Sequence, residues 1–187
     1  MGIALITSKM IAVFVGPGGM AYIGNFRNFM TSLEGISTLA FSSGVVKYVG
    51  ENEDKEKELT KIITTVLVTF LVFSTVLGFL IFVFSDFLCA KFFGNNLQYE
   101  IVFKVVAIVL PFSVVSVLFV SIINGLGSYS KLIYATIISN IIALVLTVLL
   151  IYEFKLVGAL LSTALNPTIL FTINFFYVPK ELQLLSR

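Results

Sequence analysis

Four long runs without a charged residue dominate this sequence of 187 residues. They extend over residues 62–85, 105–130, 132–152 and 156–179. Each is at least as long as the roughly 20 apolar residues that a helix needs to cross about 30 Å of hydrocarbon. With 58% hydrophobic and 12% charged residues, the chain also has more apolar surface than one soluble core could cover. The sequence therefore predicts an integral membrane protein with at least four spanning helices.

Glycine, proline and charged residues divide the chain into six apolar segments, so we predict an all-α polytopic membrane fold with six transmembrane helices. The expected helices cover residues 1–15, 20–47, 62–85, 101–124, 132–152 and 156–178. The first one ends at GPGG (16–19) after about 15 residues, or roughly 22 Å, which is too short to span the bilayer. Lys9 lies inside this apolar stretch. A signal peptide would instead carry its positive charge ahead of the stretch. We expect the sequence to begin inside a helix.

The second segment, 20–47, contains two charges, so its place in the membrane depends on the topology of the whole chain. Lysine and arginine are enriched on the cytoplasmic connections of membrane proteins. If all six segments cross, one side carries Lys47, Lys55, Lys57, Lys61, Lys131, Lys180 and Arg187. The other side carries Lys91, Lys104 and Lys155. This excess predicts both termini in the cytoplasm, and the even number of crossings that it requires supports the second segment as a span.

Residues three or four positions apart share one face of a helix, and the second segment carries five polar residues in this phase. They are Arg27, Thr31, Glu34, Thr38 and Ser42. A charge at mid-membrane costs from about 2.5 kcal/mol to far more, so such residues face a bundle interior or a water-filled cavity. The stripe therefore predicts a polar cavity wall. The alternative is that Arg27 snorkels to the membrane surface while Glu34 pairs with a neighbour.

A cationic cavity wall would suit an anionic substrate. The candidate substrate-binding residues are Arg27, Lys9, Asn25, Asn28 and Thr31. Lys9 either joins Arg27 as an anion-binding pair or neutralises Glu34 across the two helices. Glu34 itself is a candidate for tuning the charge of the cavity or for coupling transport to a proton or cation.

Two prolines lie inside expected helices, Pro111 in the fourth segment and Pro167 in the sixth. Each should kink its helix and free a carbonyl that must face protein or water. These kinks serve either alternating access or only a static bend. Polar residues accompany them at near-helical spacing, namely Ser113, Ser116, Ser121, Asn124 and Asn166. Ser139 and Asn140 of the fifth segment are interpreted as ordinary partners in hydrogen bonds between helices.

Several classes of chemistry lack the residues that they need. The sequence has no histidine and a single cysteine, Cys89, which removes the commonest general base and any cysteine metal cluster. No P-loop lysine follows the GPGG turn. We therefore expect no enzyme, no metal and no cofactor. The net charge of +2 is spread along the loops and gives no reason to expect a nucleic acid partner.

Four blocks of the sequence carry a resemblance to a known family. They are AVFVGPGGMAYIGNFRNFMTSLEGIST, GVVKYVGE, FGNN and FKLVGALLSTALNP. In this order they resemble the N-terminal half of Wzx-type polysaccharide flippases, which serve O-antigen and lipid III, within the multidrug/oligosaccharidyl-lipid/polysaccharide exporter superfamily.

The resemblance implies one six-helix lobe, residues 1–187, of a twelve-helix fold with a central cavity, truncated at both ends. It further implies alternating-access transport of undecaprenyl-diphosphate-linked oligosaccharide across the bacterial inner membrane, with a second lobe or a second copy as partner. Arg27 falls in the NFR block of the family. Two other functions stay open: a cation-coupled exporter of small molecules on the same fold, and a membrane scaffold subunit that does not transport.

Overall fold

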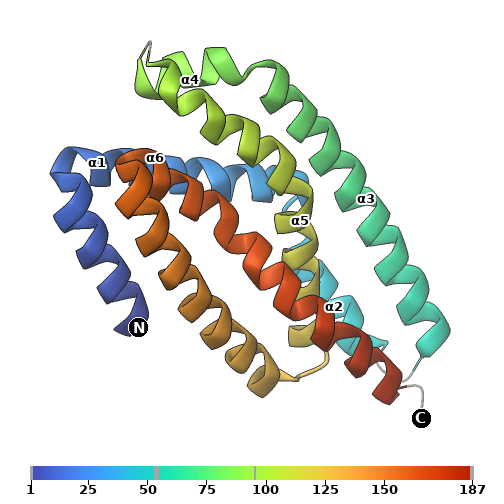
Figure 1. Cartoon of the computed structure of the whole chain (residues 1–187). Coiled ribbons are helices and arrows are strands. Elements are labelled where there is room, and N and C mark those ends of the chain that lie inside the picture. The colour runs from blue at the N-terminus through green and yellow to red at the C-terminus, as the bar shows by residue number, and fades with distance from the viewer. Residues whose placement is uncertain (1, 53–54, 95, 186–187) are drawn as a thin grey trace.

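The structure, a computed structural model, describes residues 2–52, 55–94 and 96–185, and within these ranges the regular elements are all helical (Figure 1). The α-helices are α1 (Gly2–Ser37), α2 (Ser42–Glu51), α3 (Glu56–Val83), α4 (Ser85–Phe93), α5 (Glu100–Gly125) and α6 (Tyr129–Leu185). A short 3-10 helix, η1 (Leu97–Tyr99), precedes α5.

Two of these elements are each made of two helical arms that meet at a sharp bend. The backbone of α1 leaves helical geometry at Gly16 (φ 77°, ψ 175°), directly before Pro17. Glycine adopts such angles at little cost, and proline is favoured at the first position of a helix. The backbone of α6 leaves helical geometry at Lys155 (φ 49°, ψ −122°). Both α1 and α6 therefore have a first and a second arm, divided at these residues.

The helix predicted over 20–47 is not continuous, which corrects the sequence-based expectation. The chain leaves the helix after Ser37, and Leu39 and Ala40 have positive φ values of 51° and 52°. The Leu39 amide donates to Ile36 O (3.0 Å) and the Ala40 amide to Gly35 O (2.9 Å). This is the hydrogen-bond pattern of a Schellman ending, although it usually has a glycine where Leu39 stands. A separate helix, α2, follows.

Within the described residues, three helices are long and apolar enough to cross a membrane: Lys57–Val83, Glu100–Gly125 and Leu132–Phe176. The last, with 45 residues, is divided by the bend at Lys155 into two arms of roughly 30 Å each. These helices confirm the prediction of an all-α membrane protein. The second arm of α1, with Arg27 and Glu34, is not among them, so its crossing, the count of six spans and the twelve-helix fold stay predictions.

The connections between helices gather at two opposite ends of the molecule (Figure 1). One end has the bend of α1, the α4–η1 connection and the bend of α6. The other has the α2–α3 connection and the α5–α6 turn. Consecutive long helices therefore run in opposite directions. This is the alternation that underlies the count of lysine and arginine residues, whereas the compartment that each end faces stays a prediction.

Helix α5 lies at the centre of the bundle. In its most apolar window 67% of the residues are buried, against 22% in the corresponding windows of α3 and α6. Small residues allow close approach. A Cβ on Gly78 of α3 would lie 2.6 Å from Ala107 O, and one on Gly125 would lie 2.9 Å from Val46 O of α2. Glycine at such contacts is typical of packed membrane helices.

The two prolines do not interrupt their helices. Helix α5 continues through Pro111 from Glu100 to Gly125, and the second arm of α6 continues through Pro167. Because Pro111 has no amide hydrogen, the carbonyl of Ala107, four residues earlier, loses its helical hydrogen bond. That carbonyl lies against Gly78, so it faces protein, as expected for a freed carbonyl. Whether either proline serves alternating access stays a prediction.

Aromatic rings hold the second arm of α1 against α4 and α5. Phe26 and Phe103 meet edge to face with centroids 6.2 Å apart, and Phe29 lies 5.1 Å from Phe92. Phe93 stacks on Tyr99 at 4.5 Å. Such pairs contribute about 0.5–1.5 kcal/mol each beyond burial of their area. Since Phe26 and Arg27 are neighbours in sequence, this cluster fixes the position of the charged stripe.

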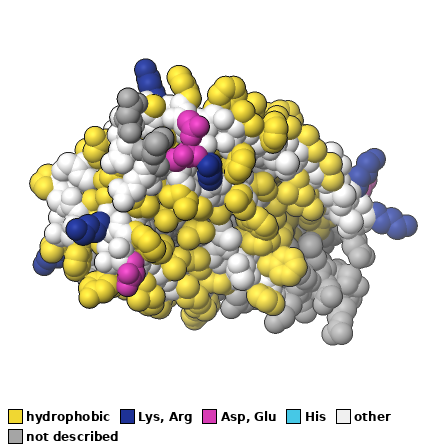
Figure 2. Space-filling model, turned by 45° about the horizontal axis from the view of Figure 1, so that its top comes forward, with side chains coloured by type: hydrophobic (Ala, Val, Ile, Leu, Met, Phe, Trp, Pro, Cys, Tyr) yellow, Lys and Arg dark blue, Asp and Glu magenta, His cyan; other side chains and the backbone are white. Residues whose placement is uncertain are grey.

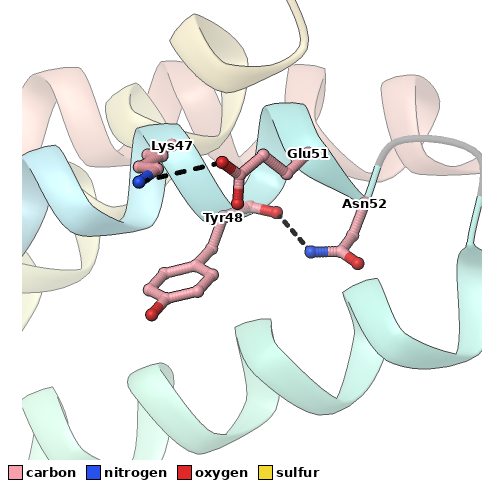
Figure 3. Close-up of polar contacts among 4 residues, drawn as sticks. All are labelled: Lys47, Tyr48, Glu51 and Asn52. Carbon is pink, nitrogen blue, oxygen red and sulfur yellow. Dashed lines mark hydrogen bonds and ion pairs between the residues drawn. The ribbon is translucent and has the colours of Figure 1, made fainter.

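Helix α2 has one buried and one polar face. Val45 and Val49 are buried, whereas Lys47 Nζ lies 3.8 Å from a Glu51 carboxylate oxygen (Figure 3). At the C-terminus of the helix, the Asn52 amide donates to Tyr48 O at 2.9 Å and so closes the last turn (Figure 3). An exposed ion pair of this kind contributes only about 0–1 kcal/mol, so the buried face does more to hold α2 in place.

Hydrophobic side chains cover much of the outer surface, and charged ones are few and scattered over the face in Figure 2. Exposed apolar residues line α3 and the first arm of α6, including Val72, Phe79, Phe82, Ile133, Val145 and Leu149. Exposing so large an apolar surface to water is unfavourable, whereas contact with lipid chains suits it.

Candidate functional site

A polar cavity with a volume of about 520 Å³ lies where α1, α2, α5 and α6 meet. We call it the hydroxyl chamber because most of its lining side chains are uncharged hydroxyls or amides. They are Ser42, Ser43, Ser113, Ser116, Ser121, Asn124, Thr136, Ser139, Asn140 and Asn166. Of the lining residues that the structure describes, Glu34 is the one that carries a charge.

A smaller cavity, of about 220 Å³, lies between the second arm of α1 and both arms of α6. We call it the arginine chamber, because Arg27 is its cation. Its other polar lining residues are Thr31, Glu34, Thr147, Ser162, Thr163 and Asn166. The two chambers are neighbours, since Glu34, Asn166 and Pro167 line both of them. Polar groups thus follow one another through an otherwise apolar bundle.

The structure places part of the predicted stripe on these cavities. Arg27, Thr31 and Glu34 line the arginine chamber, and Ser42 lines the hydroxyl chamber although the helix breaks before it. Thr38 is not part of either lining. Its hydroxyl donates to Glu34 O (2.8 Å) within the turn that ends α1.

Three predicted substrate-binding residues lie outside both chambers. Lys9 is exposed on the first arm of α1, and Asn25 and Asn28 are exposed on the second arm. Asn28 follows Arg27 directly, so a helical step of about 100° directs its side chain to a different face. The backbone carbonyl of Asn28 accepts a hydrogen bond from the Ser32 hydroxyl at 2.9 Å.

Several chamber hydroxyls donate to their own helix. Ser113 donates to Leu110 O (2.9 Å), Ser121 to Val117 O (2.9 Å) and Thr31 to Arg27 O (3.0 Å). A hydroxyl whose hydrogen is used in this way still has an oxygen lone pair that can accept. Ser116 differs, because its hydroxyl is buried, with 2% of the residue exposed, and has no hydrogen-bond partner.

The charges of the stripe are not neutralised by neighbouring side chains. Within the part of the chain that the structure describes, ion pairs join Lys47 to Glu51 and Lys104 to Glu100, and none includes Arg27 or Glu34. Arg27 and Glu34 are seven residues apart, or roughly 10 Å along the helix axis. One end of the polar region is therefore cationic and its middle is anionic. Among the described residues no group of three His, Cys, Asp or Glu side chains is arranged to hold a metal ion.

Sequence reasoning missed the contribution of the first arm of α6. Thr136, Asn140 and Thr147 lie on one helix face, at steps of four and seven, and all three line a chamber. Ser139 and Asn140, interpreted as ordinary interhelical partners, both line the hydroxyl chamber. The helical spacing of these residues could have identified this polar face from the sequence. In the second arm, Ser162 and Thr163 precede Asn166 by four and three residues and also share its face.

Comparison with known proteins gives one family and two curated relatives. Residues 27–185 match the family described as "Polysaccharide biosynthesis protein". The chain is 28% identical over 191 residues to a protein named "Lipid III flippase" from Escherichia coli (strain K12), and equally to one of that name from Shigella flexneri. The match covers 100% of this chain and 43% of each relative, so the chain spans less than half of their length. No solved structure matches the chain.

These matches confirm the resemblance to polysaccharide flippases. The relatives are named for a transport activity, which supports the expectation that the chain is not an enzyme. The family match begins at Arg27, and every residue named in the lining of either chamber falls within it. By its sequence, its apolar helices and its extent of match, the chain belongs to the family of polysaccharide biosynthesis proteins.

Proposed function

We propose that this chain forms one lobe of a flippase that translocates undecaprenyl-diphosphate-linked oligosaccharide across the bacterial inner membrane by alternating access. The observation that carries the proposal is Arg27, an exposed cation that lines a polar cavity of an apolar helix bundle and has no ion-pair partner among the described residues. Such a residue is costly in a membrane and marks a substrate or ion pathway. The two flippases that resemble this chain support the class of cargo.

In this proposal Arg27 binds the diphosphate. A guanidinium offers five N–H donors in a planar fork that matches phosphate oxygens, and an environment with little water strengthens the attraction. Thr31 lies one turn away on the same cavity. Lys9, Asn25 and Asn28 are outside the chambers, and we assign them to the approach of the headgroup toward Arg27.

Glu34 either tunes the affinity of Arg27 for phosphate or couples transport to a proton or cation. The position of this carboxylate on both chambers, without an ion-pair partner among the described residues, favours such a role over a purely structural one. The proposal includes both termini in the cytoplasm and a second lobe, or a second copy, across the open side of the chambers. Pro111 and Pro167, each of which frees the carbonyl four residues earlier, are the proposed points of bending.

The proposal is tested by replacing Arg27 with Gln in cells whose surface-glycan export depends on this protein. A charge-assisted hydrogen bond contributes about 1.5–3 kcal/mol, so export should fall at least about tenfold while the protein level in the membrane stays normal. Thr75→Val, on the exposed side of α3 and away from both chambers, is the control. Wild-type export by Arg27→Gln would remove this residue from the mechanism.

A second candidate function is a cation-coupled exporter of small molecules. It is favoured by one observation, that the charged residue lining the larger chamber is the acid Glu34. Glu34→Gln distinguishes the two. Loss of resistance to a cationic compound, with glycan export intact, would favour the exporter.

A further inference from the structure

Resting on the proposed function, we propose that the two chambers divide the cargo: the hydroxyl chamber binds its uncharged sugar units, and the arginine chamber binds its phosphates. The proposal gives a ligand class to the larger cavity, and it follows from how charge and hydrogen-bonding groups are distributed between the two.

Among the described residues, the lining of the hydroxyl chamber has no lysine or arginine. Glu34 lines both chambers, so the group that distinguishes them for a phosphate is Arg27, which lines only the arginine chamber. The arginine chamber holds the cation. An anionic group that enters the polar region is therefore most stable beside Arg27, and the rest of the same molecule is left to extend past Glu34.

Neutral sugars fit what the hydroxyl chamber offers. A sugar ring presents hydroxyls in several directions, each able to donate and to accept. Serine, threonine and asparagine side chains also supply both functions, and a carboxylate accepts from two hydroxyls at once. With about 520 Å³, the chamber lies in the range of about 300–1,000 Å³ that is typical of ligand sites, whereas the arginine chamber, at about 220 Å³, lies below it.

Ser116 is a second, independent indication of a ligand. Buried hydroxyls nearly always have a hydrogen-bond partner, and one without a partner needs an explanation. The Ser116 hydroxyl is buried on α5, lines the hydroxyl chamber and has no partner. Ser113, three residues before it, and Ser121, five residues after it, donate to their own backbone and leave acceptor oxygens. Ser116 is thus available to donate to a sugar hydroxyl.

The described part of the hydroxyl chamber's lining contains no aromatic ring. Sugar affinity there must come from hydrogen bonds without stacking. Loss of two of these bonds should therefore reduce affinity by a moderate factor, about fivefold for each, because one bond contributes about 1 kcal/mol.

The test uses the full chain in lipid nanodiscs and two probes, undecaprenyl diphosphate and the same lipid with two N-acetylglucosamine units attached. The variants are Ser116→Ala combined with Asn140→Ala, Arg27→Gln, and the control Ser74→Ala. Ser74 is also a buried serine, but it lies on α3 and outside both chambers. Dissociation constants are measured for every pair, and thermal unfolding verifies that the variants are folded.

We expect the sugar-bearing lipid to bind the wild type more tightly than the bare lipid does. The double variant should lose at least about tenfold in affinity for the sugar-bearing lipid and nothing for the bare one, whereas Arg27→Gln should weaken both equally and Ser74→Ala neither. If the double variant binds both probes like the wild type while Arg27→Gln loses both, the division of cargo is wrong and the proposed function stands. If neither probe binds the wild type, both proposals fail.

Discussion

Gly78 is the position where a single added methyl group has the most clearly defined cost. A Cβ there would lie 2.6 Å from the carbonyl oxygen of Ala107 and 3.5 Å from its carbon. Contacts of Cβ atoms this short are essentially absent from proteins, and the atom that it meets is backbone, which cannot rotate away. Gly78→Ala must therefore separate α3 from α5 by several tenths of an ångström.

The magnitude follows from two opposing effects. Overpacking in a close contact typically costs about 1–3 kcal/mol, and the separation also weakens any Cα–H···O contact to the freed carbonyl, by about 0.5–1 kcal/mol. Alanine regains up to about 1 kcal/mol of helix propensity over glycine. The net expectation is a loss of about 1–3 kcal/mol. For a chain of this size that corresponds to a fall in melting temperature of roughly 2–4 °C per kcal/mol.

The chain carries its own reporter for this measurement. Cys89 is the single cysteine, and only 1% of it is exposed. A maleimide dye that fluoresces on reaction with a thiol will therefore report unfolding of the purified protein in detergent. Gly24→Ala is the matched control, since a Cβ there meets nothing within 4 Å. An equal melting temperature for Gly78→Ala and Gly24→Ala would refute the argument that this carbonyl sets the α3–α5 distance.

Three further predictions concern other positions. Asn174→Leu should stabilise the protein by about 1–3 kcal/mol in the same dye assay, because both polar atoms of this fully buried amide lack a partner; a lower melting temperature would reveal a partner such as water. Leu39→Gly should raise the free energy of unfolding by about 1 kcal/mol, because it relieves the strain of a left-handed backbone at φ 51°. The control is Leu71→Gly. No gain in the free energy of unfolding relative to that control would mean that the Leu39 side chain contributes as much as the strain costs. Burial, followed by the nearby carboxylates of Glu100 and Asp86, raises the pKa of the Cys89 thiol, so less reactive thiolate is present at pH 8 than in the unfolded chain. N-ethylmaleimide should therefore react more slowly with the folded protein than with the protein in SDS. Equal reaction rates would contradict the burial of this thiol.

The membrane helices were predictable because their cause is local. A lipid environment demands about 20 apolar residues in a row, and runs such as 101–124 therefore reproduce the bounds of α5, Glu100–Gly125, closely. The polar stripe was predictable for a similar reason. Helical spacing alone brings Arg27, Thr31 and Glu34 onto one face, and the structure has them on one cavity.

The break between α1 and α2 was not predictable from local signals. Leu39 and Ala40 are poor choices for left-handed angles, and no glycine or proline marks the site. Such angles persist only where surrounding packing determines them. The bend at Lys155, in contrast, was predicted, because it falls in the connection between the helices expected over 132–152 and 156–178. Its neighbour Gly158 is a more ordinary turn signal, although the angle itself is at a lysine.

The contribution of Ser139 and Asn140 illustrates a different difficulty. A hydroxyl or amide on a membrane helix satisfies the same spacing rule whether it faces another helix or a cavity. Only the packing of α6 against α5 decides between the two. The sequence pattern therefore gave the correct face of the helix and left its neighbour undetermined.

The bend of α6 has a practical consequence for anyone who modifies this protein. Thr147 on the first arm and Ser162 on the second belong to the same small chamber, and the chain turns between them with no loop. Gly158 packs so closely on the Leu150 carbonyl that a Cβ would overlap it. An epitope tag inserted at this turn would spread two walls of a binding site apart. The α5–α6 turn, where Gly127 is exposed at φ 65°, is the better place for a label.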